Sequence, residues 1–352
     1  MKKKIAVCLP TYNESENIIK ITTSIDISLK KFCDKYECYI VNADNNSNDC
    51  TNDIFNNVVT FNKKISIISN EIGKGYNIKN FLLFCKNYDI DFAITIDADL
   101  KSFNETWIYK MIFFLENNYD FVVPNYYRPL YEGNTTNHFA VPVIYLFYGR
   151  FIRQPIGGEY AFNKKYINKI LKMNFSDKLL KYGIDIFMVV TAIVNNFNII
   201  QVDYGVKIHN DSYYKMKNIF EDVVLGFCET YKLYSQKFNQ NMKKEEIVYT
   251  IKKSKMQKFK YRDFFNGEFS NLLDKYHIIN DYETIRSKWL DYLVKFIEIM
   301  PNIDARFIND FKNYFMLYCV SFWDKNEKNI NWENEIIYNV ERVAIGNENS
   351  DK

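Results

Sequence analysis

Residues 91–99 read DFAITIDAD, a short apolar run that ends in two aspartates. The run predicts a buried strand, and alternation along it would point Asp97 and Asp99 to the same side, with the small Ala98 between them. Helical patterns separate this run from three earlier β-rich runs, which are IAVCLP (5–10), CYIVNAD (38–44) and ISIISN (65–70). Crossovers of a dozen or more residues between strands predict an α/β fold with a doubly wound, mostly parallel sheet.

Polar residues follow each predicted strand, at the edge where such sheets bind ligands. In chain order they are Tyr12, Asn13 and Glu14, then Asp44, then Lys74 in a Gly-Lys-Gly turn, and finally Asp97 and Asp99. We expect Asn13 to cap a helix, with Glu16 three residues on. Each residue alone would be an ordinary cap or turn residue, but together they predict one polar crevice.

The rest of the chain divides into a second α/β part and a helical part. Residues 120–127 and 198–210 predict strands, and 182–194 predict a helix. From about residue 213 the pattern is helical, with long amphipathic helices near 283–300 and 305–323 and a frayed tail from Ile345. We therefore expect a catalytic domain over 1–235, with a donor half to about 125 and an acceptor half over 126–235. A helical region would follow over 236–352, with oligomerisation and lid closure as two roles open to it.

Composition narrows the function classes. Apolar residues make up 47% of the chain, enough for a large core, and the net charge of +3 comes from interspersed charges. No basic stripe predicts a nucleic-acid partner, and the run Lys252–Lys260 reads as a solvated face. Seven scattered cysteines without a CxxC pair predict reduced thiols in a cytoplasm. We expect neither a signal peptide nor an integral membrane segment, because the longest apolar stretch (139–152) is too short.

The DAD string and one histidine predict a metal site. A divalent cation held by oxygen ligands neutralises a leaving diphosphate efficiently. Surface loops also produce DxD by chance, so its place after an apolar strand carries the argument. His209 follows a predicted strand in GVKIH, and a neutral imidazole there would complete a mixed oxygen and nitrogen site with Asp99. A lone histidine is more often structural, which is our interpretation of His277.

Four other positions have a ligand-binding interpretation and a structural one. Lys74 lies in a turn too short for a phosphate-binding P-loop, but it could still meet a phosphate or a base. Asp44 could accept a hydrogen bond from a nucleobase N–H or start a turn. In QPIGGE (154–159) two glycines allow close backbone approach to a ligand, and Glu159 could accept from sugar hydroxyls, or the string is a tight turn. Asp185 could cap its helix or bind acceptor hydroxyls.

The order of these strings resembles a known enzyme group. PTYNE, D-x-x-S-x-D, GKG, DAD, YYRP, QPIGGEYA, YGID and GVKIH follow one another from Ile5 to about Tyr231. This succession is similar to that of the GT-A glycosyltransferases, and most of all to the glucosyl-3-phosphoglycerate synthase and mannosylglycerate synthase group. The resemblance implies a metal-dependent retaining hexosyltransferase that uses a UDP- or GDP-linked sugar and a small polar acceptor. It also implies that the departing phosphate takes the acceptor's proton.

The resemblance implies a role for each matching residue. Glu14 and Asp44 would hold the nucleotide, with Pro10 and Tyr12 beside them, and Lys74 would meet the base or diphosphate. Asp99 and His209 would bind Mg²⁺ or Mn²⁺, and Asp97 would support the metal site and the donor ribose. Gly157, Gly158 and Glu159 would hold the donor sugar, while Asp185 and Arg128 would border the acceptor as catalytic residues.

One string departs from the group. Its members carry G-R-x-T, whose arginine pairs with the acceptor's phosphate, whereas this chain has Asn134 within Gly133–Thr136. An amide cannot replace a bidentate guanidinium. We keep Asn134 and Thr136 as candidate ligand-binding residues, and Arg128, Arg150 and Arg153 as candidates to compensate. Glycerate or another small hydroxy acid then competes with 3-phosphoglycerate as acceptor.

Other functions were weighed. Transfer to a lipid phosphate or a surface glycan would predict membrane association. A silent nucleotide-sugar-binding protein should have lost a metal ligand, yet Asp97, Asp99 and His209 are all present. A nucleotidyltransferase should begin with a G-x-G-T-R loop, which this sequence lacks. The base stays open, because Asp44 suits both the N3–H of uracil and the N1–H of guanine.

Overall fold

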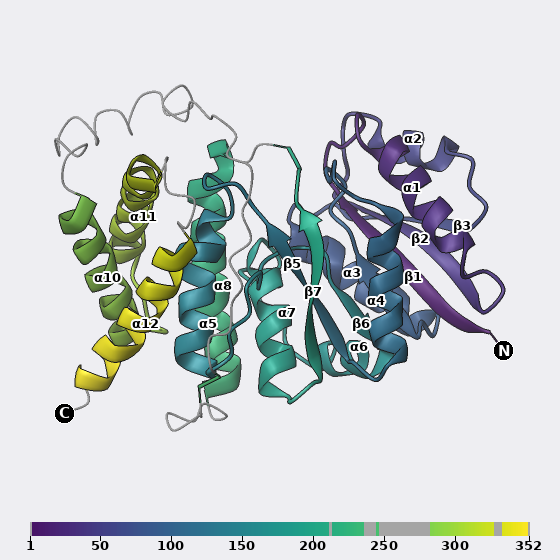
Figure 1. The fold of residues 1–352 in the computed structure, drawn as a ribbon. Coiled ribbons are helices and arrows are strands. Elements are labelled where there is room, and N and C mark those ends of the chain that lie inside the picture. Colours follow the sequence, from purple (N-terminus) through teal and green to yellow (C-terminus); the bar gives the residue numbers. More distant parts are fainter. Residues whose placement is uncertain (1, 211–212, 236–243, 246–281, 327–332, 351–352) are drawn as a thin grey trace. The chain divides into compact units, whose positions relative to one another are not determined.

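A seven-stranded sheet forms the core of the computed structural model, in the order β3-β2-β1-β4-β6-β5-β7 (Figure 1). The structure describes residues 2–210, 213–235, 244–245, 282–326 and 333–350. His277 and the run Lys252–Lys260, for which the sequence predicted structural and solvated roles, lie outside the described residues. The strands are β1 (Lys3–Thr11), β2 (Tyr36–Asp44), β3 (Lys63–Ile68), β4 (Phe92–Thr95), β5 (Phe121–Tyr127), β6 (Ala161–Asn163) and β7 (Ile199–Val206).

The four N-terminal strands are parallel, as the long crossovers predicted. β1 pairs with β2 and β4, and β2 pairs with β3. The register places Thr11 beside Asp44, and Asp44 beside Ile68, so the carboxyl ends of these three strands lie level. After β4 the chain stays beside β1, because the Ile96 N–H donates to the Cys8 carbonyl at 2.9 Å. The polar residues that follow these strands therefore share one edge of the sheet.

Strand β6 runs against its neighbours. It is antiparallel to both β4 and β5, so it enters the sheet at the edge where β4 ends. The string QPIGGE immediately precedes β6 and is thereby placed beside the residues that follow β4. Sequence patterns gave no sign of this direction, because a three-residue strand has too short a pattern to show it.

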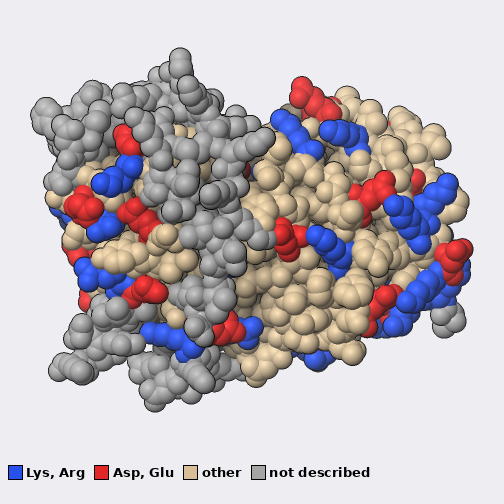
Figure 2. All heavy atoms as spheres, viewed as in Figure 1, with Lys and Arg blue, Asp and Glu red and all other residues tan. Residues whose placement is uncertain are grey.

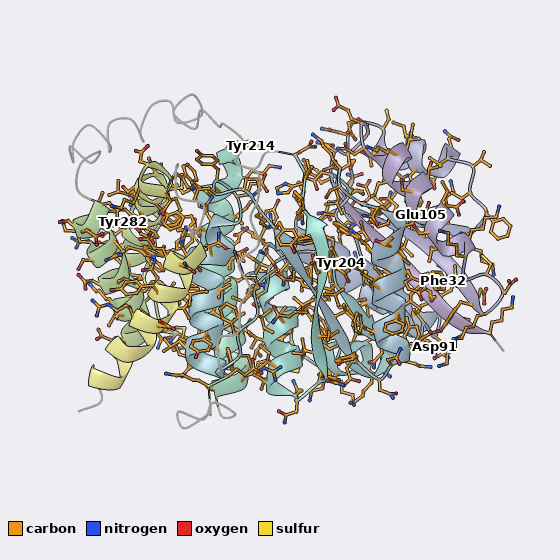
Figure 3. The ribbon with its side chains drawn as sticks, viewed as in Figure 1. Phe32, Asp91, Glu105, Tyr204, Tyr214 and Tyr282 are labelled. Carbon is orange, nitrogen blue, oxygen red and sulfur yellow. The ribbon has the colours of Figure 1, made fainter. Side chains whose placement is uncertain are left out.

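Helices cover both faces of the sheet. In the N-terminal strands, alternate residues such as Ile5 and Val7 pack with α1 and α4 in one cluster, as period-2 alternation requires. Helices α3, α6 and α7 contact one another and form a separate group (Figure 1). Tyr204, which is labelled on β7 in Figure 3, stacks on Trp107 of α4 with ring centroids 5.0 Å apart. The helices are α1 (Ile18–Lys30), α2 (Thr51–Asn57), α3 (Lys74–Asn87), α4 (Glu105–Glu116), α6 (Lys164–Ile170) and α7 (Gly183–Val194).

The chain folds as two compact units, of which the sheet is the first. The first comprises residues 1–126, 154–211 and 225–230, and the second comprises 127–153, 212–224 and 231–352. The predicted boundary between a catalytic domain (1–235) and a helical region (236–352) stays a prediction. It differs from the division between the two compact units. Residues 127–153, expected within the catalytic domain, belong with the C-terminal helices because their aromatic side chains pack there.

The second unit is helical and rich in aromatic rings. Trp289 stacks on Phe311 and Tyr318, with centroids 5.1 and 5.6 Å away. His138 is buried against the Tyr318 ring, and burial lowers its pKa to about 3, so it is neutral. The helices of this unit, in which α8 also contributes to the first, are the π-helix η1 (Thr136–Ala140), α5 (Val141–Tyr148), the 3-10 turn η2 (Tyr213–Lys215), α8 (Met216–Tyr234), α10 (Tyr282–Ile299), α11 (Ala305–Asn326) and α12 (Glu333–Ser350).

Several local expectations are confirmed and others are wrong. The two long amphipathic helices are α10 and α11. The tail from Ile345 is not frayed, because it belongs to α12. Asn13 does not cap a helix: it has a left-handed φ of 57°, and α1 begins five residues later. In the part of the chain that the structure describes, no helix is long and apolar enough to cross a membrane.

Candidate active site

Two lysine ammonium groups hold the carboxylate of Asp97 between them. Lys74, the first residue of α3, lies 2.9 Å from Asp97 Oδ1, and Lys207, just after β7, lies 3.3 Å from Oδ2. Burial by itself would raise the pKa of Asp97, but the two lysines outweigh it and hold that pKa below its ordinary value. Asp97 is therefore ionised and fully engaged with cations.

Glu159 is the most deeply buried charge of the site. It is 0% exposed, and both its oxygens lie 2.8 Å from Lys207 Nζ. The Tyr126 hydroxyl donates to Glu159 Oε2 at 2.7 Å. Burial raises the pKa of Glu159 to about 7, against the opposing pull of Lys207. The prediction of Glu159 as a buried acceptor agrees with this burial, although its partners here belong to the protein.

Asp185 extends the network on the other side. It lies in the first turn of α7, and its Oδ2 is 3.2 Å from Lys74 Nζ. Burial raises the pKa of Asp185, and Lys74 opposes that rise. Three carboxylates and two ammonium groups are thus linked through Lys74 and Lys207. When all five are ionised, the network has one excess negative charge.

The glycine at position 158 is required by this packing. Gly158 has a φ of +93°, and a Cβ there would lie 2.4 Å from Asp97 Oδ2 and 2.9 Å from Lys74 Nζ. Thr95, the last residue of β4, donates from its hydroxyl to the Gly158 carbonyl at 2.7 Å. The same hydroxyl accepts from the Tyr160 N–H at 3.0 Å. The loop before β6 is therefore fixed directly against the turn that contains Asp97.

Asp99 and His209 face each other beside the network. His209 Nδ1 lies 4.0 Å from Asp99 Oδ2 and 2.7 Å from the Asn210 carbonyl. A proton on Nδ1 donated to that carbonyl leaves Nε2 with its lone pair. The argument that strand alternation aligns Asp97 with Asp99 is wrong, because β4 ends at Thr95 and both residues lie in the following turn. Among the described residues, no three His, Cys, Asp or Glu side chains group closely enough to hold a metal alone.

The PTYNE turn and the Asp44 segment are tied together at the ends of β1 and β2. Asp44 is buried, and its Oδ1 accepts from the hydroxyls of Ser47 and Thr11 at 2.5 and 3.2 Å. The Glu14 N–H donates to Thr51 Oγ1 at 2.8 Å. Tyr12 is 43% exposed next to this turn, after Pro10 at the end of β1. The structure therefore brings these predicted nucleotide-side residues to one edge.

Comparison with known proteins identifies the domain. Residues 6–174, slightly less than half of the chain, match the family described as Glycosyl transferase family 2. Over this range the chain is similar to the family 2 glycosyltransferases. Asp44, Lys74, Asp97 and Asp99 of the glycosyltransferase lie within the matched range, as does Glu159. No curated protein is similar enough in sequence to count as a match.

Solved structures agree on the fold of the glycosyltransferase, which is GT-A. Glucosyl-3-phosphoglycerate synthase from Mycobacterium tuberculosis, crystallised with Mn²⁺, UDP-glucose and phosphoglyceric acid, has 20% identity and a TM-score of 0.54. That comparison covers 66% of this chain and 80% of that one. The same enzyme with Mg²⁺ and UDP gives 20% identity, 65% and 79% coverage and a TM-score of 0.52. A mycobacterial protein gives 22% identity, 65% and 74% coverage and a TM-score of 0.53.

Three predicted residues of the glycosyltransferase belong to the second unit. Arg128 is buried there, with Glu132 as an ionic partner at 3.8 Å. Asn134 accepts from the indole N–H of Trp323 at 3.0 Å and donates to the Tyr131 carbonyl at 2.9 Å. Thr136 is buried at the start of η1. Their assignment to ligand binding stays a prediction.

Sequence reasoning missed Lys207 as a site residue of the glycosyltransferase. Lys207 is 3% exposed, whereas its apolar neighbours Val206 and Ile208 are 48% and 49% exposed. Hydrophobic patterning predicts that the apolar residues at a strand end are buried and that a lysine there is exposed. The structure shows the opposite arrangement. The position of Lys207 in the sequence could have indicated its place in the site. It lies two residues before His209, which was expected at the ligand-binding edge of the sheet.

Basic and acidic side chains are interspersed elsewhere on the glycosyltransferase. On the face drawn in Figure 2, lysines and arginines of the described residues lie beside aspartates and glutamates. Lys31 with Glu105 and Lys63 with Glu37 are such ion pairs. Exposed pairs of this kind contribute little to stability.

Proposed function

We propose that the protein is a metal-dependent retaining glycosyltransferase. It moves a hexose from UDP-glucose or GDP-mannose to a small hydroxy acid such as glycerate or 3-phosphoglycerate. The single observation that carries the proposal is the approach of Asp99 to His209 beside the buried network of Asp97, Lys74 and Lys207. That arrangement unites a carboxylate, an imidazole and a cation at the edge where a nucleotide sugar would lie.

Asp99 and His209 fit a divalent cation. Asp99 Oδ2 lies 4.0 Å from Nδ1 of His209, so the two side chains are neighbours. Because Nδ1 donates to the Asn210 carbonyl, Nε2 of the same ring would be the second ligand atom. Mg²⁺ is commonly held by one or two protein ligands together with substrate phosphates, which suits a pair rather than a closed cage. When bound, the cation would supply charge neutralisation for the leaving diphosphate.

Lys74 and the loop before β6 would hold the rest of the donor. Lys74 has three N–H donors, and two carboxylates contact its ammonium group. The third donor is available to a diphosphate oxygen. The backbone of Gly157 and Gly158 would lie against the sugar, with Glu159 behind them. Asp44 would accept from the N–H of the base.

Asp185 would border the acceptor, and the residue at 134 bears on which acceptor that is. The M. tuberculosis enzyme was crystallised with phosphoglyceric acid and with glycerol 3-phosphate, which supports a small acceptor. In this chain the Asn134 amide is bonded to Trp323 and Tyr131. That engagement supports an acceptor that needs no phosphate contact at position 134. Glycerate is accordingly our preferred acceptor over 3-phosphoglycerate.

A donor-by-acceptor screen tests the proposal. Purified protein is incubated with UDP-glucose or GDP-mannose, with glycerate or 3-phosphoglycerate, and with Mn²⁺, Mg²⁺ or EDTA, and products are detected by mass. We expect a hexosyl product that EDTA abolishes, with a weak response to 3-phosphoglycerate that Asn134→Arg increases. Donor binding without any turnover would favour a silent binding protein. Full activity in EDTA would contradict the metal assignment.

A further inference from the structure

We infer that Lys207 is a positioning residue that holds the loop of Gly157, Gly158 and Glu159 in its sugar-binding shape. The inference rests on the proposed function only in assigning the donor sugar to this loop. Lys207 follows an edge strand far along the chain from the loop, yet its side chain is buried against it. No contact with a substrate is needed for this role.

The ammonium group of Lys207 is saturated by the protein. It has three N–H donors, and it contacts the Gly157 carbonyl at 2.7 Å, the Glu159 carboxylate at 2.8 Å and Asp97 Oδ2 at 3.3 Å. The Tyr126 ring covers it with its centroid 5.3 Å from Nζ. Lys74, in contrast, has a third donor to offer. The two lysines therefore have different tasks, and Lys207 cannot reach a phosphate without giving up a partner.

The loop needs an external anchor because of its own sequence. Two successive glycines leave its backbone free to adopt many conformations, and Gly158 has a left-handed φ. Two side chains from different strands fix two successive carbonyls: Lys207 holds that of Gly157, and Thr95 holds that of Gly158. Removing either donor leaves one carbonyl of the pair free to rotate. The sugar-facing backbone would then lose its fixed orientation.

Lys207 also keeps the charge of the loop inside. Without its ammonium group, Glu159 would be a buried carboxylate with only a tyrosine hydroxyl as donor. A buried carboxylate that loses its ammonium partner either becomes neutral or moves toward water. In both cases the loop loses the contact that ties Glu159 to Lys207. Asp97 keeps Lys74 as a partner at 2.9 Å, and Asp99 faces His209 at 4.0 Å, so we expect this side of the site to persist. The expected loss is thus specific to the sugar part of the donor.

The test compares ligands with and without the sugar. In Lys207→Met, we expect the affinity for UDP-glucose with Mn²⁺ to fall about 10- to 100-fold, as for other residues that orient ligand-binding groups. The affinity for UDP with Mn²⁺, also measured by calorimetry, should stay within about twofold, because the proposed function places UDP at Asp44, Lys74 and the metal ligands rather than at the loop. GDP-mannose and GDP form the parallel pair. Equal losses for the sugar-linked and sugar-free nucleotides, or no loss for either, would overturn the inference.

A ligand-free readout separates this inference from the proposed function. Hydrogen exchange of the apo protein should be faster at residues 157–160 in Lys207→Met and unchanged at the strands β1 and β2. If the wild type binds no nucleotide sugar, the proposed function fails while exchange still tests the loop. Unchanged exchange at 157–160 would sink the positioning role.

Two further variants guard against a folding artefact. The double variant Lys207→Met/Glu159→Gln removes the stranded carboxylate, so it should recover the melting temperature while its loop still exchanges fast. If the double variant is as protected as wild type, the inference is wrong. Lys110→Met is the matched control, because Lys110 donates to the Asp203 carbonyl of β7 at 2.7 Å but not to the loop. It should change neither sugar affinity nor loop exchange.

Discussion

The interiors of the two compact units are built from different chemistry. The first unit buries charged side chains at one edge of its sheet, among them Glu159, Asp185 and Lys207. The second buries mainly stacked rings such as Trp289 and Phe311, with two arginines, Arg128 and Arg153, among them. Its buried hydrogen bond from Trp323 to Asn134 joins neutral groups. Burying ion pairs seldom stabilises a fold, whereas burying aromatic rings does. We therefore expect substitutions in the ion-pair network to change activity and substitutions among the stacked rings to change stability.

The sharpest test of this comparison targets Asp99 and His209, the proposed metal ligands of the first unit. Asp99→Asn and His209→Ala should each lower the transfer rate by about 100- to 1000-fold, since each removes a ligand that would hold charge near the leaving group. Melting temperatures should stay close to wild type, because both side chains are only partly buried. Activity with Mn²⁺ and thermal unfolding measure the two effects. A folded His209→Ala variant with a near-normal rate would contradict the assignment.

In the second unit the large effect should fall on stability. Trp289→Ala should lower the free energy of unfolding by about 3–5 kcal/mol, because it empties a fully buried position between Phe311 and Tyr318. Urea unfolding followed by circular dichroism gives the value. Trp289→Phe serves as the control and should lose less, since it keeps a ring in place. A loss below about 1 kcal/mol for the alanine variant would mean that this cluster is not a core.

A single hydrogen bond sharpens the comparison. Trp323→Phe keeps the ring but removes the donor that Asn134 Oδ1 accepts from, which should cost about 1–3 kcal/mol. Equilibrium unfolding measures the cost. In the double variant Trp323→Phe/Asn134→Leu the cost should be smaller than the sum of the two single losses, because no buried amide is left unpaired. Additive losses would show that the two side chains do not depend on each other.

The smallest expected effect concerns acid stability in the first unit. Asp120 accepts from the Asn198 N–H at 2.9 Å and from Asn163 Nδ2 at 2.8 Å. Burial would raise its pKa, but these donors and Lys165 outweigh it and lower that pKa in the folded state. A lowered folded pKa stabilises the fold above the unfolded value of about 4, and this contribution is lost as pH falls through the folded pKa.

Asp120→Asn should therefore be about 1 kcal/mol less stable than wild type at pH 7. The gap should narrow below about pH 4, where the wild-type carboxylate becomes protonated. Urea unfolding at several pH values measures it. A gap that does not change with pH would show that the charge of Asp120 is not what the neighbouring donors stabilise.

The sequence allowed much of the first unit to be predicted. The ends of β1, β2 and β3 follow from apolar runs bounded by polar turns, so Asp44 and Lys74 lie at the expected edge. Asp99 and His209 were expected together, and they approach within 4.0 Å. The alignment of Asp97 with Asp99 was not predictable, because it depends on where β4 ends. That strand ends at Thr95, whose hydroxyl bonds to the Gly158 carbonyl and the Tyr160 N–H. Sequence periodicity does not reveal such contacts between distant segments.

What escaped prediction depends on contacts between distant segments. Lys207 is buried only because Gly157 and Glu159 arrive beside it through β6, whose direction no pattern revealed. The pairing of Asn134 with Trp323 joins a loop to a helix that begins far along the chain. Local sequence propensity does not predict such pairings. A sequence can therefore indicate candidate site residues without indicating which distant side chains position them.

The short strand β6 also has a practical consequence for altering this protein. Thr95 bonds through one hydroxyl to both the Gly158 carbonyl and the Tyr160 N–H. The spacing from Gly158 to Tyr160 is therefore fixed by a single side chain of β4. Adding or deleting a residue between Gly158 and Tyr160 would break one of the two bonds to Thr95. It would also shift the loop that packs against Asp97. Changes in sugar preference should therefore be sought by substituting side chains around these two hydrogen bonds, without insertions or deletions in the loop.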